Sequence, residues 1–278
     1  MSTIDINELR PEQLIIPDWP APVRVRAAST TRWGGVSAPP YDSLNLAGHV
    51  GDDPAHVAEN RRRLAAAVGY PAEPAWLEQV HGITVIAAET VRAPVAADAA
   101  WTRTPGQPCV VMTADCLPVL LCDRAGTMVA AAHAGWRGLA GGIIAATVAR
   151  MATPPRELLA WLGPAIGPDA FEVGEEVRAA FLNLDAGNAG CFQPSPAGRW
   201  LADIYELARR QLWGLGVREI YGGGCCTFSE PERFFSYRRE NRTGRMATLI
   251  WLECAEAFRD GRACGRSFAG PNSNQEPA

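Results

Sequence analysis

The apolar residues of the chain alternate between short β-type runs and longer runs with helical spacing. The short runs are rich in Val, Ile and Leu, and they predict strands over 23–28, 83–88, 109–113, 117–122, 128–132, 159–162 and 218–221. The longer runs predict helices over 53–68, 139–151, 174–182 and 201–212. Asp53 and Pro54 are suited to the N-cap and first position of the first of these helices, and Gly69 to its end.

The last third of the chain contains one expected hairpin and one expected tail. Residues 234–238 and 246–252 predict a β-hairpin that turns at 241–244. From about residue 259 the composition becomes polar and rich in Gly and Asn, which predicts a flexible tail over 259–278. No repeat or linker divides the rest of the chain. We therefore expect a single α/β domain over residues 1–258, built of layered mixed β-sheets flanked by helices.

Composition narrows the classes of function. The chain has 278 residues, 47% of them hydrophobic, which is enough for a large core. Its net charge of -4 gives no reason to expect a nucleic-acid partner. All 26 basic residues are Arg, since the sequence contains no Lys. This excludes Schiff-base chemistry, a P-loop lysine and a Ser–Lys dyad.

The sequence also bears on location. Residues 1–16 contain acidic side chains and no long apolar run, so we expect no secretory signal. The most apolar stretch, 109–122, is interrupted by Asp115 and Pro118, so we expect no membrane span. The eight cysteines include no CxxC pair, which argues against a zinc knuckle and a disulfide scaffold. Together these features predict a cytoplasmic protein.

Three side chains at the boundaries of apolar runs are candidates for chemistry: His81, Cys116 and His133. In one scheme they bind a single Zn²⁺ and leave a fourth position open for water or substrate. In the other, Cys116 is a thiolate nucleophile and His133 is its base. The alternative to both schemes is that they are ordinary core or loop residues. The other two histidines, His49 and His56, have no evident partner in the sequence.

The turn after His133 is a second candidate feature. A strand that ends in His-Ala-Gly-Trp-Arg-Gly and leads into a helix directs backbone N–H groups towards its end. We expect an anion pocket there, with Arg137 at its rim. The spacing does not match the glycine fingerprint of a dinucleotide site.

Several motifs, taken in order, resemble one known family. They include 31–37, 43–46, 51–54, 60–61, 79–82, 98–102, 113–118, 133–138, 163–167, 172–174, 226–227, 235–239 and 244–245. The chain resembles the YfiH-like family, also named the laccase-domain or multicopper polyphenol oxidase family, whose members are described as purine nucleoside phosphorylases. Of the adjacent Cys225 and Cys226, only Cys226 falls on the Cys-Thr step of the family.

The resemblance implies a particular site and activity. It implies one zinc per chain on His81, Cys116 and His133, although copper has also been proposed for the family. It implies cleavage of adenosine, inosine or guanosine by phosphate, giving the base and ribose 1-phosphate, and deamination of adenosine. Asp115 would orient a ligand, transfer a proton or cap the loop. The candidates for substrate binding are Arg32, Asn45, Arg61, Arg137, Arg238 and Arg245, with Tyr237 or Trp136 stacking on the purine.

Three other functions remain open from the sequence. The first is an amide hydrolase, dependent on zinc or on Cys116, that acts on peptidoglycan precursors. The second is a copper-binding polyphenol oxidase, although four histidines are too few for a multicopper centre. The third is a non-catalytic binding protein. The oligomeric state is not predicted by any of these features.

Overall fold

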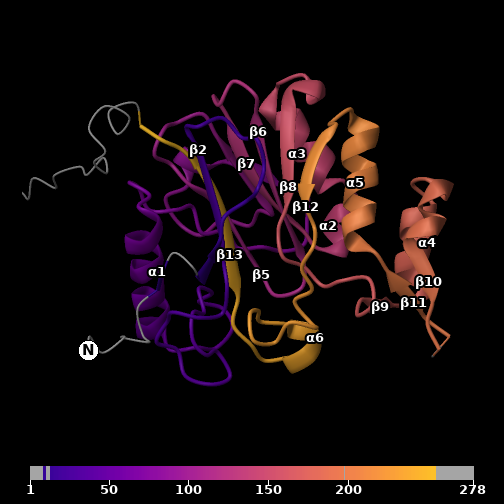
Figure 1. Cartoon of the computed structure of the whole chain (residues 1–278), viewed down its shortest axis with the longest axis horizontal. Helices are drawn as coiled ribbons and strands as arrows, with labels where there is room; N and C mark the ends of the chain where they lie inside the picture. Colours follow the sequence, from indigo (N-terminus) through magenta and orange to yellow (C-terminus); the bar gives the residue numbers. More distant parts are fainter. Residues whose placement is uncertain (1–8, 11–12, 197, 255–278) are drawn as a thin grey trace, which may run out of the picture.

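Two β-sheets packed face to face form the centre of the computed structural model, which describes residues 9–10, 13–196 and 198–254 (Figure 1). The first sheet has four strands in the order β1 (Leu14–Ile15), β2 (Val25–Thr30), β13 (Met246–Leu252), β5 (Cys109–Thr113). The second has six, in the order β12 (Glu219–Gly222), β8 (Leu158–Leu162), β6 (Leu117–Asp123), β7 (Val129–Ala134), β4 (Ala99–Thr102), β3 (Val85–Ala87). A small third sheet has the order β10 (Phe192–Pro194), β11 (Trp200–Ala202), β9 (Glu172–Val173).

Helices cover the outer faces of the two large sheets (Figure 1). Helix α1 (Pro54–Val68) packs on the four-stranded sheet, and α3 (Ile143–Met151) and α5 (Ile204–Leu215) pack on the six-stranded sheet. The remaining helices are α2 (Trp136–Gly141), α4 (Glu175–Leu182) and α6 (Tyr237–Glu240), with 3₁₀ turns at Ala88–Thr90, Pro155–Glu157 and Ala186–Cys191. The layered α/β architecture predicted from the sequence is confirmed.

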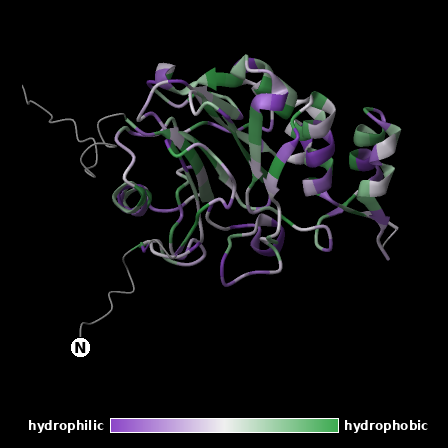
Figure 2. Ribbon diagram, turned by 45° about the horizontal axis from the view of Figure 1, so that its top comes forward, coloured by the Kyte–Doolittle hydropathy of each residue, from purple (hydrophilic) through white to green (hydrophobic). Residues whose placement is uncertain are grey.

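Alternation along the strands divides the core into three layers. In β13, Ile250 faces the six-stranded sheet, whereas Leu249 faces α1. In β7, Ala131 faces the four-stranded sheet, whereas Ala132 faces α3. Figure 2 shows the central strands coloured mainly as hydrophobic, while the outer helices carry both colours. By the same alternation, His133 faces the layer between the two sheets.

The predicted hairpin of 234–238 with 246–252 is wrong. Strand β13 forms, but it pairs with β2 and β5, and residues 237–240 form helix α6. Phe234 and Phe235 are both fully buried, so they do not alternate as strand residues would. The hydroxyl of Ser236 accepts the backbone N–H of Arg239 at 3.3 Å and begins the short helix instead.

Two predicted helices differ from the observed ones, one in its first residue and the other in being divided in two. The predicted helix over 201–212 is strand β11 followed by α5, because Asp203 caps the helix by accepting the N–H of Glu206 at 2.9 Å. The predicted helix over 139–151 is two helices, because Gly142 has a left-handed φ of 98°. The first predicted helix is confirmed, with Asp53 as its N-cap and Gly69 as its C-cap.

Other boundaries move by a few residues. The strand expected over 128–132 runs to Ala134 and so includes His133. The sequence did not predict β1, β4, β9 or β10. The flexible tail expected over 259–278 lies outside the described residues. Within the described part of the chain, no helix combines the length and apolarity needed to cross a bilayer.

Candidate metal centre

The three predicted ligands come together where the chain crosses from one sheet to the other. Strand β5 belongs to the four-stranded sheet and β6 to the six-stranded sheet, and Cys116 lies in the short connection between them. The ligating atoms of His81, Cys116 and His133 all lie within 4.8 Å of one another. The Cys116 Sγ is 3.7 Å from His81 Nε2, and the two imidazole rings pack edge to face with centroids 4.8 Å apart.

The local backbone is shaped to direct these side chains inward. His81 has a φ of 60° and Asp115 a φ of 100°, both uncommon for residues other than glycine. A Cβ atom at Gly135 would lie 2.8 Å from His81 Cδ2 and 2.9 Å from Cys116 Sγ. Only glycine at position 135 therefore leaves room for two of the ligands.

The carboxylate of Asp98 orients both histidines. Asp98 is completely buried, and its Oδ1 lies 2.8 Å from His133 Nδ1. The same oxygen accepts the backbone N–H of His81 at 2.9 Å, and Oδ2 accepts that of Gly82 at 2.6 Å. Because Nδ1 of His133 is occupied, Nε2 faces the centre. A carboxylate bound to the far nitrogen of a histidine is the usual outer support of a metal ligand.

Electrostatics favour a thiolate at Cys116. Burial opposes ionisation of the thiol, but His133 and His81 outweigh it and lower the pKa of Cys116 to about 6. Burial likewise opposes protonation of His133, but the thiolate and Asp98 outweigh it and raise the pKa of His133 to about 9. A thiolate and two imidazoles are the ligand types that Zn²⁺ prefers, and three protein ligands leave a coordination position open. The donor set therefore fits a catalytic zinc ion.

The carboxylate of Asp115 binds another segment of the chain instead of a histidine of the candidate site. Its Oδ1 accepts the hydroxyl of Thr227 at 2.6 Å, and its Oδ2 accepts the backbone N–H of Arg238 at 2.7 Å. Asp115 therefore anchors the segment 227–238 beside the metal centre. The partner of the ligand His133 is Asp98, which the sequence placed in a family motif without assigning it a role. The sequence does contain a signal for this role, since Asp98 lies in the apolar run Ala96-Ala97-Asp98-Ala99-Ala100. A carboxylate buried in such a run needs a hydrogen-bond partner.

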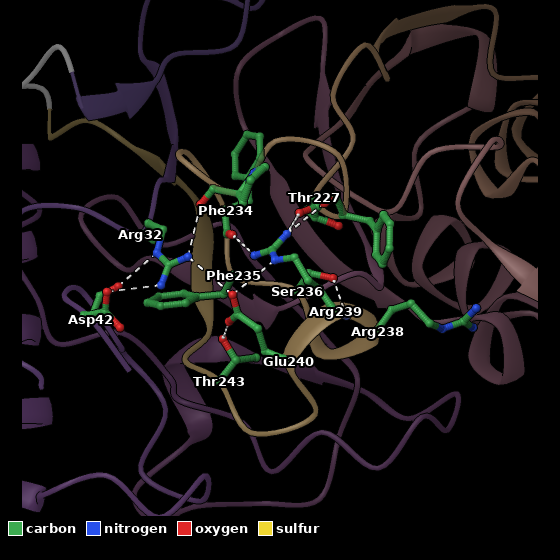
Figure 3. Close-up of polar contacts among 12 residues, drawn as sticks. Arg32, Asp42, Thr227, Phe234, Phe235, Ser236, Arg238, Arg239, Glu240 and Thr243 are labelled. Atoms are coloured by element: carbon green, nitrogen blue, oxygen red, sulfur yellow. Dashed lines mark hydrogen bonds and ion pairs between the residues drawn. The ribbon is translucent and has the colours of Figure 1, made fainter. Parts of the chain in front are cut away.

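Two of the predicted substrate-binding residues are structural. The guanidinium of Arg32 is buried and donates to Asp42 and to the carbonyl of Pro231, and it pairs with Glu240 at 3.7 Å (Figure 3). The side chain of Asn45 is also buried, and both of its polar atoms bond within the structure. Neither has a polar group left for a ligand.

A second arginine in Figure 3 holds the segment that Asp115 contacts. Arg239 donates to the carbonyls of Thr227, Phe228 and Phe234 at distances of 2.7, 2.9 and 2.7 Å. Its Nε also donates to Glu240 at 3.1 Å, which joins it to the Arg32 network. This network fixes the path of residues 227–240 and thereby places Asp115's partners.

The other four predicted arginines differ in their surroundings. Arg61 and Arg245 are half-buried, and Arg245 is close enough to Cys116 to feel its charge. Arg238 is exposed, and its guanidinium donates to the carbonyl of Glu172 at 2.8 Å. Arg137 is exposed and lies 4.5 Å from the ring of Trp136.

At the turn after His133, where the sequence predicts an anion pocket, the backbone packs closely against another loop. Helix α2 has only six residues, and a Cβ at Gly138 would lie 3.0 Å from the carbonyl oxygen of Gly82. The turn therefore packs against the loop that carries His81. Trp136 packs on the core under α3, whereas Tyr237 is 53% exposed and lies 5.6 Å from the Arg245 guanidinium. Of the two aromatic residues, Tyr237 is the better placed to meet a ligand.

Comparison with known proteins defines the class. Residues 26–253 match the family described as multi-copper polyphenol oxidoreductase laccase, and the chain belongs to that family. It is 59% identical over 240 residues to a purine nucleoside phosphorylase of Pseudomonas aeruginosa, covering 86% of this chain and 98% of that protein. It is 58% identical over 243 residues to the purine nucleoside phosphorylase YfiH of Escherichia coli, covering 86% and 99%.

Solved structures agree with the fold. A Neisseria meningitidis protein superposes with a TM-score of 0.84 at 52% identity, covering 87% of this chain and 100% of the other. The protein YlmD of Geobacillus stearothermophilus superposes with a TM-score of 0.82 at 32% identity, covering 90% and 100%. The resemblance to YfiH-like proteins expected from the motifs is thus confirmed.

Proposed function

We propose that this chain is a zinc-dependent purine nucleoside phosphorylase that converts adenosine, inosine or guanosine and phosphate into the base and ribose 1-phosphate. The observation that carries the proposal is similarity over 86% of this chain to proteins named for that activity, combined with the His81–Cys116–His133 cluster. Deamination of adenosine to inosine is the second activity proposed for the same site. A zinc ion bound there would supply Lewis-acid polarisation of a substrate atom.

The surrounding residues support phosphorolysis. In the reaction, a phosphate oxygen forms a bond to C1′ of the ribose while the bond from C1′ to the purine breaks and the purine leaves with a proton. Phosphate needs strong hydrogen-bond donors, and Arg is the natural choice in a chain without Lys. The charge of Cys116 acts on Arg245, and the exposed ring of Tyr237 lies 5.6 Å from the Arg245 guanidinium. We assign Arg245 to phosphate and Tyr237 to the purine face.

The metal is proposed to be zinc, one ion per chain. The family description names several coppers, but within the described residues His81, Cys116 and His133 form the one cluster of His, Cys and acidic side chains that could hold a metal. All four histidines of the chain are described, and the other two contribute to no such cluster. A mixed thiolate and imidazole set with an open position favours zinc. Six of the described cysteines, Cys109, Cys116, Cys122, Cys191, Cys225 and Cys226, are free thiols, which supports a cytoplasmic location for the enzyme.

Product analysis tests this proposal. Zinc-loaded protein is incubated with adenosine or inosine, with and without phosphate, and the products are separated by chromatography. We expect free base and ribose 1-phosphate only when phosphate is present, and inosine from adenosine in either case. A zinc-loaded protein that turns over no nucleoside would contradict the proposal and favour the amide hydrolase as the function of the same site.

A further inference from the structure

The loop that carries His81 is held to its surroundings by side chains. His81 is exposed and has a left-handed φ of 60°, a conformation that costs free energy for a residue other than glycine. The backbone N–H groups of Val80, His81 and Gly82 all donate to the Asp98 carboxylate, at 3.3, 2.9 and 2.6 Å. Because Asp98 also binds the His133 ring, these hydrogen bonds fix His81 relative to one of the other two ligands.

Gln79 joins the same loop to the strand that leads to Cys116. Its Nε2 donates to the carbonyl of Met112 at 2.7 Å, and its Oε1 accepts the backbone N–H of Met112, also at 2.7 Å. Met112 lies in β5, the last strand in the order of the four-stranded sheet. The amide of Gln79 therefore binds both backbone groups of a residue at the sheet edge, as a residue of a further strand would.

This contact lies close to two metal ligands along the chain. Gln79 is two residues before His81, and Met112 is four residues before Cys116. The Cys116 Sγ and the His81 Nε2 are 3.7 Å apart. Since a metal site needs its ligands held to within about 0.5 Å, a pair of hydrogen bonds that fixes Gln79 against Met112 limits how far His81 can move away from Cys116.

We propose that Gln79 is a positioning residue of the metal site, which holds His81 beside Cys116 so that both can bind the same ion. The inference rests on the metal ion of the proposed function and adds a residue that acts on it through His81. The two polar atoms of the Gln79 amide are hydrogen-bonded to Met112, so Gln79 is not itself a ligand. Asp98 relates His81 to His133, and Gln79 relates His81 to Cys116.

Replacing Gln79 by Met tests this role. Methionine keeps the length and approximate volume of the side chain, but it cannot donate a hydrogen bond and accepts only weakly. We expect Gln79→Met to bind zinc at least about tenfold more weakly than the wild type, as when an outer support of a metal ligand is lost. Competition with a chromophoric chelator measures the affinity, and thermal unfolding of the metal-free proteins shows that the variant is folded.

The absorption spectrum of the cobalt-loaded protein identifies the ligand that is affected. Co²⁺ substituted for Zn²⁺ shows a charge-transfer band from a bound thiolate and d–d bands that depend on the number and geometry of the ligands. In Gln79→Met we expect the thiolate band to persist, because Cys116 is unchanged, and the d–d bands to shift towards those of His81→Ala. A merely structural role would lower the unfolding temperature and leave the wild-type spectrum.

A double-mutant cycle tests whether Gln79 acts through His81. In protein that already carries His81→Ala there is no imidazole to position, so adding Gln79→Met should change the zinc affinity by less than about twofold. An effect as large as in the wild-type background would mean that Gln79 supports the centre without His81, and would overturn the inference.

Gln79→Glu provides the same test if Gln79→Met does not fold. Its carboxylate can still accept the N–H of Met112, but it cannot donate to the Met112 carbonyl. With one of the two hydrogen bonds lost, zinc should bind at least about threefold more weakly. Wild-type zinc affinity in folded Gln79→Glu would contradict the positioning role.

The matched control is Gln107→Met, which makes the same substitution near the other end of β5. Gln107 Nε2 donates to the carbonyl of Glu73 at 3.3 Å, and this variant should keep the wild-type zinc affinity and cobalt spectrum. Wild-type affinity and spectrum in Gln79→Met, or an equal loss in the control, would overturn the inference even if nucleosides are phosphorolysed. A loss specific to Gln79, in a protein that binds zinc but turns over no nucleoside, would support the inference and contradict the proposed function.

Discussion

At the scale of single residues, the geometry of the candidate metal centre depends on one buried carboxylate. Asp98 accepts hydrogen bonds from the His133 imidazole and from the backbone N–H groups of His81 and Gly82. It therefore links the ring of one ligand to the backbone of another. This link is a side-chain contact between residues that are distant in the sequence, which explains why the motif alone did not assign it.

Replacing Asp98 by Asn is predicted to weaken zinc binding about 10- to 100-fold. The amide has the same shape, but its NH₂ group would face another N–H donor, either in the backbone of residues 81–82 or on His133. One of these hydrogen bonds would therefore be lost. Competition with a chromophoric chelator measures the affinity. The control is Asp123→Asn, a buried acid at the other end of β6 that accepts the N–H groups of Thr127 and Met128. The control should lower stability and leave zinc affinity unchanged, and equal affinities in all three proteins would argue against the role of Asp98.

Cys116 is predicted to react as a thiolate in metal-free protein. Its pKa is lowered to about 6, so the thiolate predominates above pH 6 and the alkylation rate falls as the pH drops below 6. Burial raises the pKa of Cys122 to about 12, so that thiol stays protonated and serves as the internal comparison. Mass spectrometry of iodoacetamide-treated protein follows each cysteine. Zinc should protect Cys116, and a rate midpoint near pH 9 or a lack of protection would refute this account.

At the scale of elements, the site depends on how strand β7 passes into helix α2. The sequence predicted that His133 is followed by a glycine-rich turn and a helix, and both are present. It did not predict that the helix breaks at Gly142, where the backbone is left-handed. It also did not predict that Gly135 lies against His81 and Cys116, because these contacts join residues distant in the sequence.

A methyl group at position 135 is predicted to disrupt the metal site while leaving the fold intact. The φ of -61° at Gly135 suits alanine, but the added Cβ would displace His81 and the Cys116 sulfur. We expect Gly135→Ala to bind zinc at least about tenfold more weakly, because mutations that disturb the orientation of metal ligands have effects of this size. The control is Gly142→Ala, where the Cβ meets no atom but φ is 98°. That variant should lose about 1–3 kcal/mol of stability and keep its zinc affinity; the opposite pattern would show that Gly135 serves only the fold.

At the scale of the whole molecule, the sequence predicted the layers better than the connections between them. Buried strands such as β5 and β6 were predicted within a residue because they are short apolar runs with polar ends. The pairing of β13 between β2 and β5 was missed, since strand neighbours distant in sequence leave no local pattern. The hairpin failed for the same reason.

The same division applies to the candidate site. His81, Cys116 and His133 were identifiable as chemically distinctive residues at the ends of apolar runs, and their motifs pointed to one family. The arginines were not separable in the sequence, because Arg32 and Arg245 lie in equally family-like motifs. Only the structure shows that Arg32 is enclosed by carbonyl and carboxylate groups, whereas the charge of Cys116 acts on Arg245.

The central claim is that one metal ion on three ligands supports phosphorolysis. Its most direct test is to titrate metal-free protein with zinc and to follow the phosphate-dependent release of base from inosine. We predict that the rate rises linearly and stops rising at one zinc per chain, and that His81→Ala shows no such rise. Full phosphorolysis by metal-free protein, or a rate that keeps rising beyond one equivalent, would contradict the account.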